Sequence, residues 1–260
     1  MMLKKINTKY MTTYNYKNKN VLITGGAKGI GLETALQFAK FGANVSILSK
    51  TYYKELEVLF KPYKDRVEFY QIDVTDSSSV KQSIFEIIKS KNKIDILVNN
   101  ASIAVEGTLD KLDENDWDKV MDTNVKSYFL CTKEVINGMI KRKYGKIINV
   151  SSIAGRDKSI LLGAAYSTSK AAVIGFTRHV ASEVGKFGIN VNCICPSQTY
   201  TPMLKEIFKK NQGLEDIVKN RNPLGYIADP KQISSVILFL ASDESNYING
   251  SIIDINGGVL

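Results

Sequence analysis

A tyrosine and a lysine four residues apart, Tyr166 and Lys170, are the residues of this sequence best suited to move a proton. Positions i and i+4 share one face of a helix, so the Lys170 ammonium can lie beside the Tyr166 phenol. A phenol with a pKa of about 10 exchanges protons poorly at neutral pH unless a neighbouring cation stabilises its phenolate. Such a pair alone is more often a surface contact, so its weight depends on what lies near it.

A serine hydroxyl is predicted to lie at the same edge of the fold. Ser151 and Ser152 follow a predicted strand at 146–150, and Ser152 precedes Tyr166 by 14 residues. We favour Ser152 as the functional hydroxyl, because Ser151 should still belong to the end of the strand. A hydroxyl at this edge gives the Tyr166–Lys170 pair more weight than an isolated surface contact would have.

A glycine-rich turn at 24–31, Thr-Gly-Gly-Ala-Lys-Gly-Ile-Gly, follows the first apolar strand and precedes a helix. Glycines let the backbone turn sharply and approach a pyrophosphate, and the helix N-terminus offers unpaired N–H groups to the anion. Strand, glycine turn and helix are the required context for dinucleotide binding. The turn therefore predicts a nucleotide site.

The elements that must position these groups alternate between short apolar runs and longer amphipathic segments, which is typical of βαβ units. The strands are apolar nearly throughout, as expected when helices cover both faces of a sheet. The fold class is therefore α/β, a single Rossmann-type doubly wound parallel sheet of about seven strands. Strands are expected at 21–24, 44–48, 67–71, 94–98, 146–150, 189–194 and 251–255, and helices at 32–41, 79–89, 117–141, 165–184 and 231–240.

The 260 residues are expected to form one catalytic domain at 19–260 after a polar, basic and flexible leader at 1–18. The segment 197–228, which follows the sixth strand, interrupts the alternation and is a candidate substrate lid. Asp76 and Asp229 are expected to start helices.

The composition excludes several classes. The net charge is +9, but residues 1–20 carry five lysines and no acid, so the body is only mildly basic and a nucleic-acid partner is not expected. No apolar run reaches the length of a membrane span, and the N-terminus lacks the apolar core of a secretory signal, so a cytoplasmic protein without a membrane partner is expected. Three cysteines and one histidine predict neither a disulfide framework nor a metal site.

Taken in order, these motifs resemble those of the short-chain dehydrogenase/reductase family, from Lys19 to the end of the chain. The glycine turn is similar to TGxxxGxG, Tyr166 and Lys170 to YxxxK, and 99–102 (Asn-Asn-Ala-Ser) to NNAG. The segment 196–203 resembles PGxxxTPM, and Asp73-Val74 resembles the pair that holds adenine. Within the family, the chain resembles members similar to 3-oxoacyl-(acyl-carrier-protein) reductases.

The resemblance implies the site residues. The implied catalytic residues are Asn124, Ser152, Tyr166 and Lys170. The implied cofactor-binding residues are Gly25, Lys28, Gly29, Ile30, Gly31, Ser49, Lys50, Asp73, Val74, Asn100, Ala101, Ser102, Tyr166, Lys170, Pro196, Thr199 and Thr201. Ser102 and Ser197 depart from the family, which usually has glycine at both positions, and the spacing from Ser152 to Tyr166 is one residue longer than in many members.

The mechanism that the resemblance implies is hydride transfer between a nicotinamide and a carbonyl or secondary alcohol. Tyr166 would protonate the alkoxide, Lys170 would lower the pKa of Tyr166 and bind the nicotinamide ribose, and Ser152 would polarise the carbonyl. Asn124 would hold a water in a proton path to Lys170.

NADP(H) is the expected cofactor, with NAD(H) possible. The second strand ends in Ser49 and Lys50 rather than in a carboxylate, which would hold a ribose 2′-hydroxyl and repel a 2′-phosphate. Lys50 and Lys28 are expected to bind that phosphate as point charges.

The substrate is less well defined. A small carbonyl or alcohol is expected, with a 3-oxoacyl or ketone reductase first and a sugar or polyol dehydrogenase as the alternative. An acyl carrier protein would require a basic patch beside the pocket, to which Lys141, Arg142 and Lys143 would contribute, whereas Phe187 stands about where carrier-dependent members tend to place arginine. The resemblance also implies a homotetramer, or a homodimer; a nucleotide-sensing regulator is the non-enzyme alternative.

Other reactive residue types are expected to be structural. His179 lies too far along its helix from Tyr166 to be a base, and Cys193 and Cys195 should share a buried face of their strand. Trp117 should pack.

Overall fold

The computed structural model describes residues 14–159 and 161–260. It contains a seven-stranded sheet in the order β3-β2-β1-β4-β5-β6-β7, in which every neighbouring pair is parallel. The strands are β1 Asn20–Thr24, β2 Asn44–Ser49, β3 Val67–Gln71, β4 Ile96–Asn99, β5 Gly145–Val150, β6 Ile189–Pro196 and β7 Ile252–Ile255. The chain order reverses between β1 and β4, as in a doubly wound sheet, and confirms the predicted fold class.

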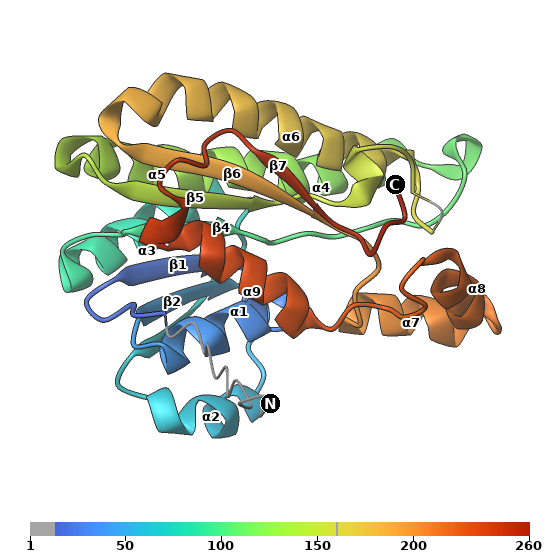
Figure 1. Cartoon of the computed structure of the whole chain (residues 1–260), viewed down its shortest axis with the longest axis horizontal. Coiled ribbons are helices and arrows are strands. Elements are labelled where there is room, and N and C mark those ends of the chain that lie inside the picture. The colour runs from blue at the N-terminus through green and yellow to red at the C-terminus, as the bar shows by residue number, and fades with distance from the viewer. Residues whose placement is uncertain (1–13, 160) are drawn as a thin grey trace, which may run out of the picture.

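Helices cover both faces of this sheet (Figure 1). They are α1 Gly29–Lys40, α2 Glu55–Phe60, α3 Ser77–Lys91, α4 Glu114–Met121, α5 Ser127–Arg142, α6 Ala164–Val184, α7 Pro202–Lys210, α8 Leu214–Arg221 and α9 Pro230–Ala241. Short 3₁₀ helices lie at Lys61–Tyr63, Leu109–Lys111, Ile153–Gly155, Gly185–Phe187 and Asp243–Ser245.

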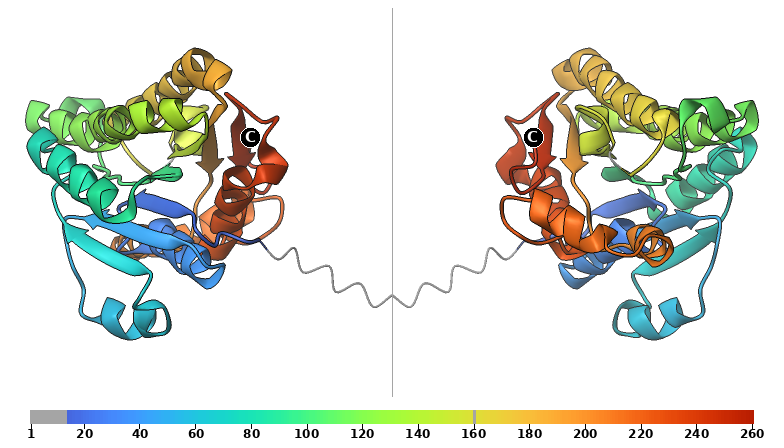
Figure 2. Two further views of the ribbon diagram at one scale, coloured as in Figure 1. Left: turned by 90° about the vertical axis from the view of Figure 1, so that its left-hand side faces the viewer. Right: turned by 90° about the vertical axis from the view of Figure 1, so that its right-hand side faces the viewer.

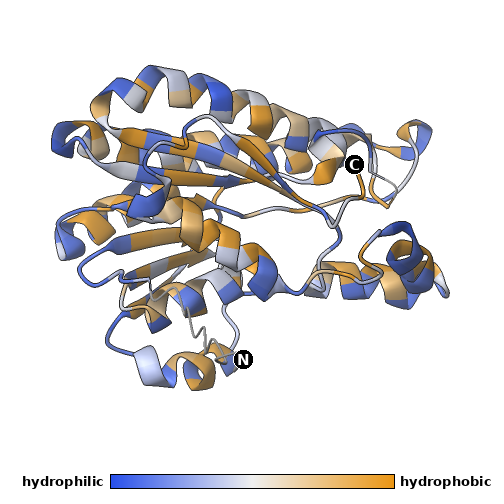
Figure 3. Ribbon diagram, viewed as in Figure 1, coloured by the Kyte–Doolittle hydropathy of each residue, from blue (hydrophilic) through white to orange (hydrophobic). Residues whose placement is uncertain are grey.

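Two apolar cores result, one on each face. α1 and α9 pack on each other beneath the sheet, whereas α3, α5 and α6 cover the opposite face, as the two side views in Figure 2 show. Apolar residues run along the strands and along the helix sides that face them (Figure 3). Because both faces are covered, strand residues such as Leu22, Ile23 and Leu97 are fully buried.

The predicted helix starts are confirmed. The Asp76 carboxylate accepts hydrogen bonds from the Ser78 and Ser79 amides at 3.0 and 3.4 Å. Asp229 begins α9 in a reciprocal arrangement with Gln232, and Pro230 occupies the first turn.

The helix predicted at 117–141 differs from the structure. Helical structure begins earlier, at Glu114 after the cap Asp113, and is interrupted by a π-helical turn, Asp122–Lys126, between α4 and α5. Asn124 lies in this turn and its side chain leaves the helix to bond Ile103, which accounts for the local widening. The short helix α2 was not predicted either, because six residues give too little apolar periodicity.

The predicted leader needs a correction in its last five residues. Residues 1–13 lie outside the described part of the chain, but Tyr14 and Tyr16 pack against the domain, whereas Asn15, Lys17 and Asn18 are exposed. Tyr16 is 3% exposed, its hydroxyl donates to the Leu238 carbonyl at 2.5 Å, and its ring contacts Phe38. The packed part of the chain therefore begins before Lys19. The aromatic side chains of Tyr14 and Tyr16 could have indicated this in the sequence.

Within 14–159 and 161–260, no helix is both long and apolar enough to cross a membrane. The segment 197–228 forms α7 and α8, which stand apart from the sheet in Figure 1 and share a small apolar cluster around Leu204, Val218 and Ile227. Its action as a lid stays a prediction.

Candidate active site

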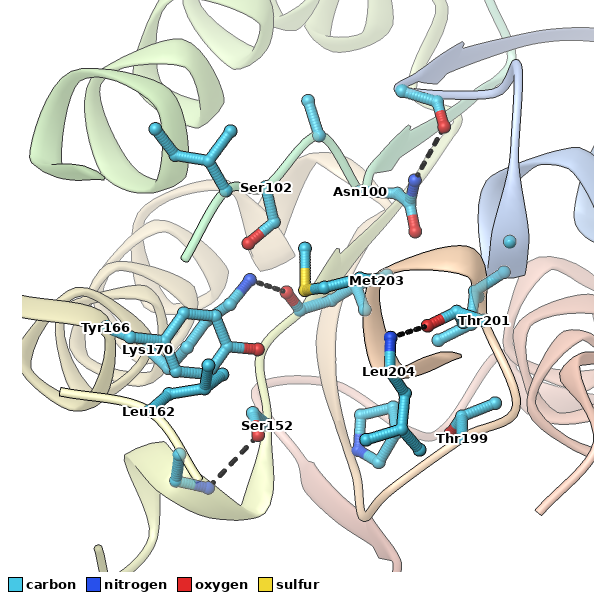
Figure 4. Close-up of a pocket in the computed structure, with 18 of the residues that line it drawn as sticks. Asn100, Ser102, Ser152, Leu162, Tyr166, Lys170, Thr199, Thr201, Met203 and Leu204 are labelled. Atoms are coloured by element: carbon cyan, nitrogen blue, oxygen red, sulfur yellow. Dashed lines mark hydrogen bonds between the residues drawn. The ribbon is translucent and has the colours of Figure 1, made fainter. Parts of the chain in front are cut away.

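A pocket of about 790 Å³ opens at the carboxyl ends of the parallel strands. The turn after β1, the segments after β4, β5 and β6, and helix α7 all contribute to its lining. This is the place where an open parallel sheet binds ligands, because the strand order reverses there. Figure 4 shows the Tyr166 hydroxyl directed into this space, with Ser152 on one side and Lys170 behind it.

Ser152 and Ser151, which the sequence could not fully separate, have different roles. Ser151 is 3% exposed and its hydroxyl donates to the Lys170 carbonyl at 2.7 Å, joining the end of β5 to α6. Ser152 follows the strand, accepts a hydrogen bond from the Ala154 amide at 3.1 Å and lines the pocket next to Tyr166. The geometry favours Ser152 as the hydroxyl that meets a substrate.

Lys170 is 1% exposed, and its Nζ donates to the Val150 carbonyl oxygen at 3.0 Å. The Tyr128 hydroxyl donates to the same oxygen at 3.0 Å, so two side chains are fixed by the last carbonyl of β5. Burial lowers the pKa of Lys170 to about 8, with Cys193 and Cys195 acting weakly in the opposite direction. The ammonium therefore lies close to its titration range at neutral pH.

Tyr166 has a protonated hydroxyl at neutral pH. Burial raises its pKa to about 12, and its interaction with Ser152 has a smaller, opposite effect. The Lys170 Nζ lies 5.6 Å from the centre of the Tyr166 ring and directs its hydrogen bond to Val150. In this structure the phenol is therefore held as an acid, and its activation by Lys170 stays a prediction.

Asn124 is fully buried, and its amide is already used within the protein. Its Nδ2 donates to the Ile103 carbonyl at 2.9 Å and to the Ser169 hydroxyl at 3.0 Å, and its Oδ1 accepts from the Ile103 amide at 2.9 Å. The side chain thus ties the loop after β4 to α6. The water that Asn124 is predicted to hold has not been tested, and these bonds leave the side chain little capacity to hold one.

The glycine turn has the shape of a phosphate cradle. Gly25 and Gly29 have φ angles of +66° and +58°, which side-chain-bearing residues rarely adopt. A Cβ on Gly31 would lie 2.5 Å from both the Asn100 Nδ2 and the Gly25 carbonyl. Lys28 begins α1 without capping it by its side chain, so the first N–H groups of the helix face the pocket uncapped. These residues fit a dinucleotide.

Asn100 and Ala101 support this cradle from behind. The Asn100 Nδ2 donates to the carbonyls of Thr24 and Gly25 at 3.0 and 3.1 Å, and the amides of Asn100 and Ala101 donate to the Thr24 hydroxyl at 3.0 Å each. In the structure their main contacts are therefore with the turn itself.

The end of β2 carries the residues predicted to meet a ribose phosphate. Lys50 is paired with Asp73, Nζ to Oδ2, at 2.7 Å, and its side chain is 79% exposed. This partner raises the pKa of Lys50 and lowers the pKa of Asp73. Ser49, Lys28 and Val74 also line the pocket, and the Val74 side chain is in addition part of the core beside it.

The segment after β6 is held mainly by its own backbone. The Thr199 hydroxyl donates to the Ser197 carbonyl at 3.0 Å, and the Thr201 hydroxyl accepts from the Leu204 amide to start α7. Pro196 ends β6 opposite Ile255. Met203 projects its sulfur toward the middle of the pocket in Figure 4.

The structure also corrects one prediction and adds residues. Lys141, Arg142 and Lys143 precede β5, and Arg142 donates to the Ile94 carbonyl at 2.6 Å before β4. Within one chain they lie at the edge of the sheet opposite the pocket, so they form no basic patch beside it. A helix that returns to the start of a parallel strand must end at that opposite edge.

The sequence analysis missed Tyr128, which is buried beside Lys170, and several residues that line the pocket, namely Lys119, Asp122, Val259 and Leu260. Asp122 precedes the predicted Asn124 by two positions, which could have identified it, but the position of the C-terminus depends on the tertiary fold. Of the other predictions, His179 pairs with Glu183 on an exposed helix face, and Cys193 and Cys195 are buried as expected.

Comparisons with known proteins agree with this geometry. Residues 19–212 match the family described as short chain dehydrogenase. The chain is 38% identical to the 3-oxoacyl-(acyl-carrier-protein) reductase FabG of Thermotoga maritima, over 94% of this chain and 98% of that protein. It is also 38% identical to the BbsD subunit of (2S)-(R)-hydroxy(phenyl)methyl-succinyl-CoA dehydrogenase of Thauera aromatica, over 93% of this chain and 96% of that one.

A solved structure described as ElxO with NADP bound is similar throughout. Its TM-score with this chain is 0.87 at 35% sequence identity, and the match covers 93% of this chain and 98% of the other.

Proposed function

The chain belongs to the short-chain dehydrogenase family, and we propose that it is an NADP(H)-dependent reductase of a 3-oxoacyl thioester or a related ketone. The observation that carries the proposal is the position of Ser152, Tyr166 and Lys170 in the same pocket as the glycine turn. A proton donor and a dinucleotide cradle in one cavity are what hydride transfer to a carbonyl requires.

The chain's own residues provide orientation and a proton. Ser152 donates a hydrogen bond to the substrate carbonyl, and Tyr166, whose raised pKa keeps it protonated, transfers its proton to the oxygen as the carbonyl is reduced. Lys170 keeps a positive charge beside the phenol, which stabilises the phenolate that Tyr166 becomes when it gives up its proton. When bound, the nicotinamide dinucleotide supplies the hydride.

The preference for NADP(H) rests on charge. β2 ends in Ser49 and is followed by Lys50, and Lys28 lies in the glycine turn that lines the same pocket. A 2′-phosphate would draw Lys50 from Asp73, exchanging one exposed ion pair for a doubly charged partner. The NADP bound to ElxO is consistent with this preference.

The substrate half of the pocket supports a partly apolar carbonyl compound. Leu161, Leu162, Met203 and Ile207 line it, and Ser159 and Gln198 add polar groups. Two curated relatives act, by their names, on a 3-oxoacyl group attached to a carrier protein and on a succinyl-CoA derivative. Both substrates are thioesters, which supports the proposal of a thioester before a sugar.

The carrier of the thioester is a separate question. Lys119, Lys158 and Arg221 line the pocket, but Asp122 and Asp157 do so as well, so the charge of its lining is mixed. A free coenzyme A thioester is therefore proposed before an acyl carrier protein.

The proposal is tested by following NADPH absorbance with acetoacetyl-CoA, simple ketones and keto-sugars in parallel. We expect the highest kcat/KM for the thioester. Turnover of the sugars alone would replace the proposal by its alternative, a sugar dehydrogenase. No turnover of any carbonyl, together with intact NADPH binding, would favour a nucleotide-sensing regulator. The homotetramer and the cytoplasmic location stay predictions, the first testable by light scattering.

A further inference from the structure

The Ser102 hydroxyl is a buried polar group without a hydrogen-bond partner, one of two such atoms in the part of the chain that the structure describes. The other, Asn99 Oδ1, belongs to an amide that is otherwise bonded to Thr132 and Asn149 inside the core. Ser102 instead lines the pocket. A buried hydroxyl without a partner costs free energy, so an unmet hydrogen bond at a pocket wall points to a ligand.

The backbone around Ser102 is fixed on both sides. Before it, the amides of Asn100 and Ala101 both donate to the Thr24 hydroxyl at 3.0 Å. After it, Ile103 exchanges two hydrogen bonds of 2.9 Å with the Asn124 amide. These bonds hold the Cα of Ser102 at the pocket wall, so the direction of its hydroxyl is set by rotation about the Cα–Cβ bond alone.

The hydroxyl points toward the end of the Lys170 side chain in Figure 4. Lys170 also has unused capacity, since an ammonium has three N–H donors and the structure gives its Nζ one hydrogen bond, to Val150. An ammonium only donates, whereas a serine hydroxyl both donates and accepts. The two groups together match a ligand that carries neighbouring hydroxyls.

We infer that Ser102 binds the nicotinamide ribose diol together with Lys170, an inference that rests on the proposed function. One ribose hydroxyl accepts from Lys170, and a hydroxyl of the same diol exchanges a hydrogen bond with Ser102. Members of the family that have glycine at this position lack the second group. Ser102 is thus a cofactor-binding residue through its side chain as well as through its backbone.

The test compares two ligands on Ser102→Ala, which keeps the backbone restrictions of a side-chain-bearing residue. NADPH contains the nicotinamide ribose, and 2′,5′-ADP contains only the adenosine end with its 2′-phosphate. Removing one hydrogen bond should raise the Kd of NADPH about three- to tenfold and leave the Kd of 2′,5′-ADP unchanged. Both dissociation constants are measured by calorimetry in the absence of carbonyl substrate.

Ser234→Ala is the matched control. Ser234 is fully buried, and its hydroxyl already donates to the Lys231 carbonyl at 3.0 Å in α9, on the other side of the sheet. This variant should bind both ligands as the wild type does.

The inference is overturned if Ser102→Ala leaves the NADPH Kd unchanged, including the case in which only the KM of the carbonyl substrate rises. It is also overturned if both ligands weaken equally, since that indicates a general distortion of the site. Equal Kd values of the wild type for 2′,5′-ADP and NADPH would also overturn it, because they would mean that the nicotinamide ribose contributes nothing to binding. A wild type that binds neither would refute the proposed function itself, a result visible before any variant is made.

Discussion

Two lysines that line the same pocket are held in opposite ways. Lys170, beyond β5, is 1% exposed and bonded to the Val150 carbonyl, and burial lowers its pKa to about 8. Lys50, beyond β2, has a side chain that is 79% exposed, and its partner Asp73 raises its pKa.

The difference indicates which properties of the protein a substitution at each end of the pocket would alter most. At the β5 end, geometry depends on the core, because Tyr128, Ser151 and Lys170 are all joined to strand or helix backbone. At the β2 end, recognition depends on a solvated ion pair, which contributes little to stability. Substitutions at the first end should therefore affect catalysis strongly, and those at the second should change cofactor choice.

The largest expected effect is that of Tyr166→Phe. It removes the hydroxyl that donates the proton and should lower kcat about a thousandfold. The Kd of NADPH should change little, since the ring remains. Single-turnover and steady-state rates measure the loss. Tyr16→Phe, which removes a buried hydroxyl that is bonded to Leu238 away from the pocket, is the control and should keep full activity. Retention of more than a small fraction of kcat by Tyr166→Phe would refute the assignment.

Lys170→Met should lower kcat about a hundredfold and weaken NADPH binding as well, because it removes both a charge beside the phenol and a ribose contact. The split between kcat and Kd distinguishes it from Tyr166→Phe.

Lys146 offers a matched control for this substitution. It is also 1% exposed with a pKa lowered by burial to about 8, but it lies at the start of β5, bonded to Asn190 and Asn246. Lys146→Met should leave both kcat and the Kd of NADPH unchanged. Equal losses in the two variants would mean that burial of a lysine, rather than its place in the pocket, is what matters.

The next largest expected effect is the dependence of kcat/KM on pH. Reduction requires Tyr166 protonated, which holds below its pKa of about 12, and Lys170 charged, which holds only below its pKa of about 8. The kcat/KM for NADPH should therefore be constant at lower pH and fall about tenfold per unit above pH 8. Lys146→Met should keep this profile and Lys170→Met should lose it. A profile flat to pH 10 in the wild type would contradict the prediction.

Much of this arrangement was predictable from the sequence because it is local. The glycine turn, the Tyr166–Lys170 spacing and the seven apolar strands each follow from neighbouring residues, and their positions at the same sheet edge follow from the parallel topology. Asn124 was placed by resemblance.

What could not be predicted depends on contacts between distant segments. The bond of Asn124 to Ile103 and the π-helical turn around it require both segments to be folded. The partner of Lys50 lies 23 residues away on the next strand end, and the unpartnered Ser102 hydroxyl is visible only once every neighbour is in place. The prediction that residues 141–143 contribute to a basic patch beside the pocket was wrong, because it considered their charge and not the end of the sheet at which the topology places them.

The smallest expected effect is a change of cofactor preference at Lys50. Lys50→Asp replaces an exposed cation with a carboxylate beside Asp73, so a 2′-phosphate would meet two negative charges and a free 2′-hydroxyl would gain an acceptor. The ratio of kcat/KM for NADPH to that for NADH should fall about tenfold or more, with kcat nearly unchanged because the β5 end is untouched. Lys54→Asp changes the net charge equally from outside the pocket and should leave the ratio nearly as it is. If Lys50→Asp leaves the ratio unchanged and Lys28→Ala lowers it, the phosphate is bound at the glycine turn instead. A wild type that already prefers NADH would show that neither lysine selects the cofactor.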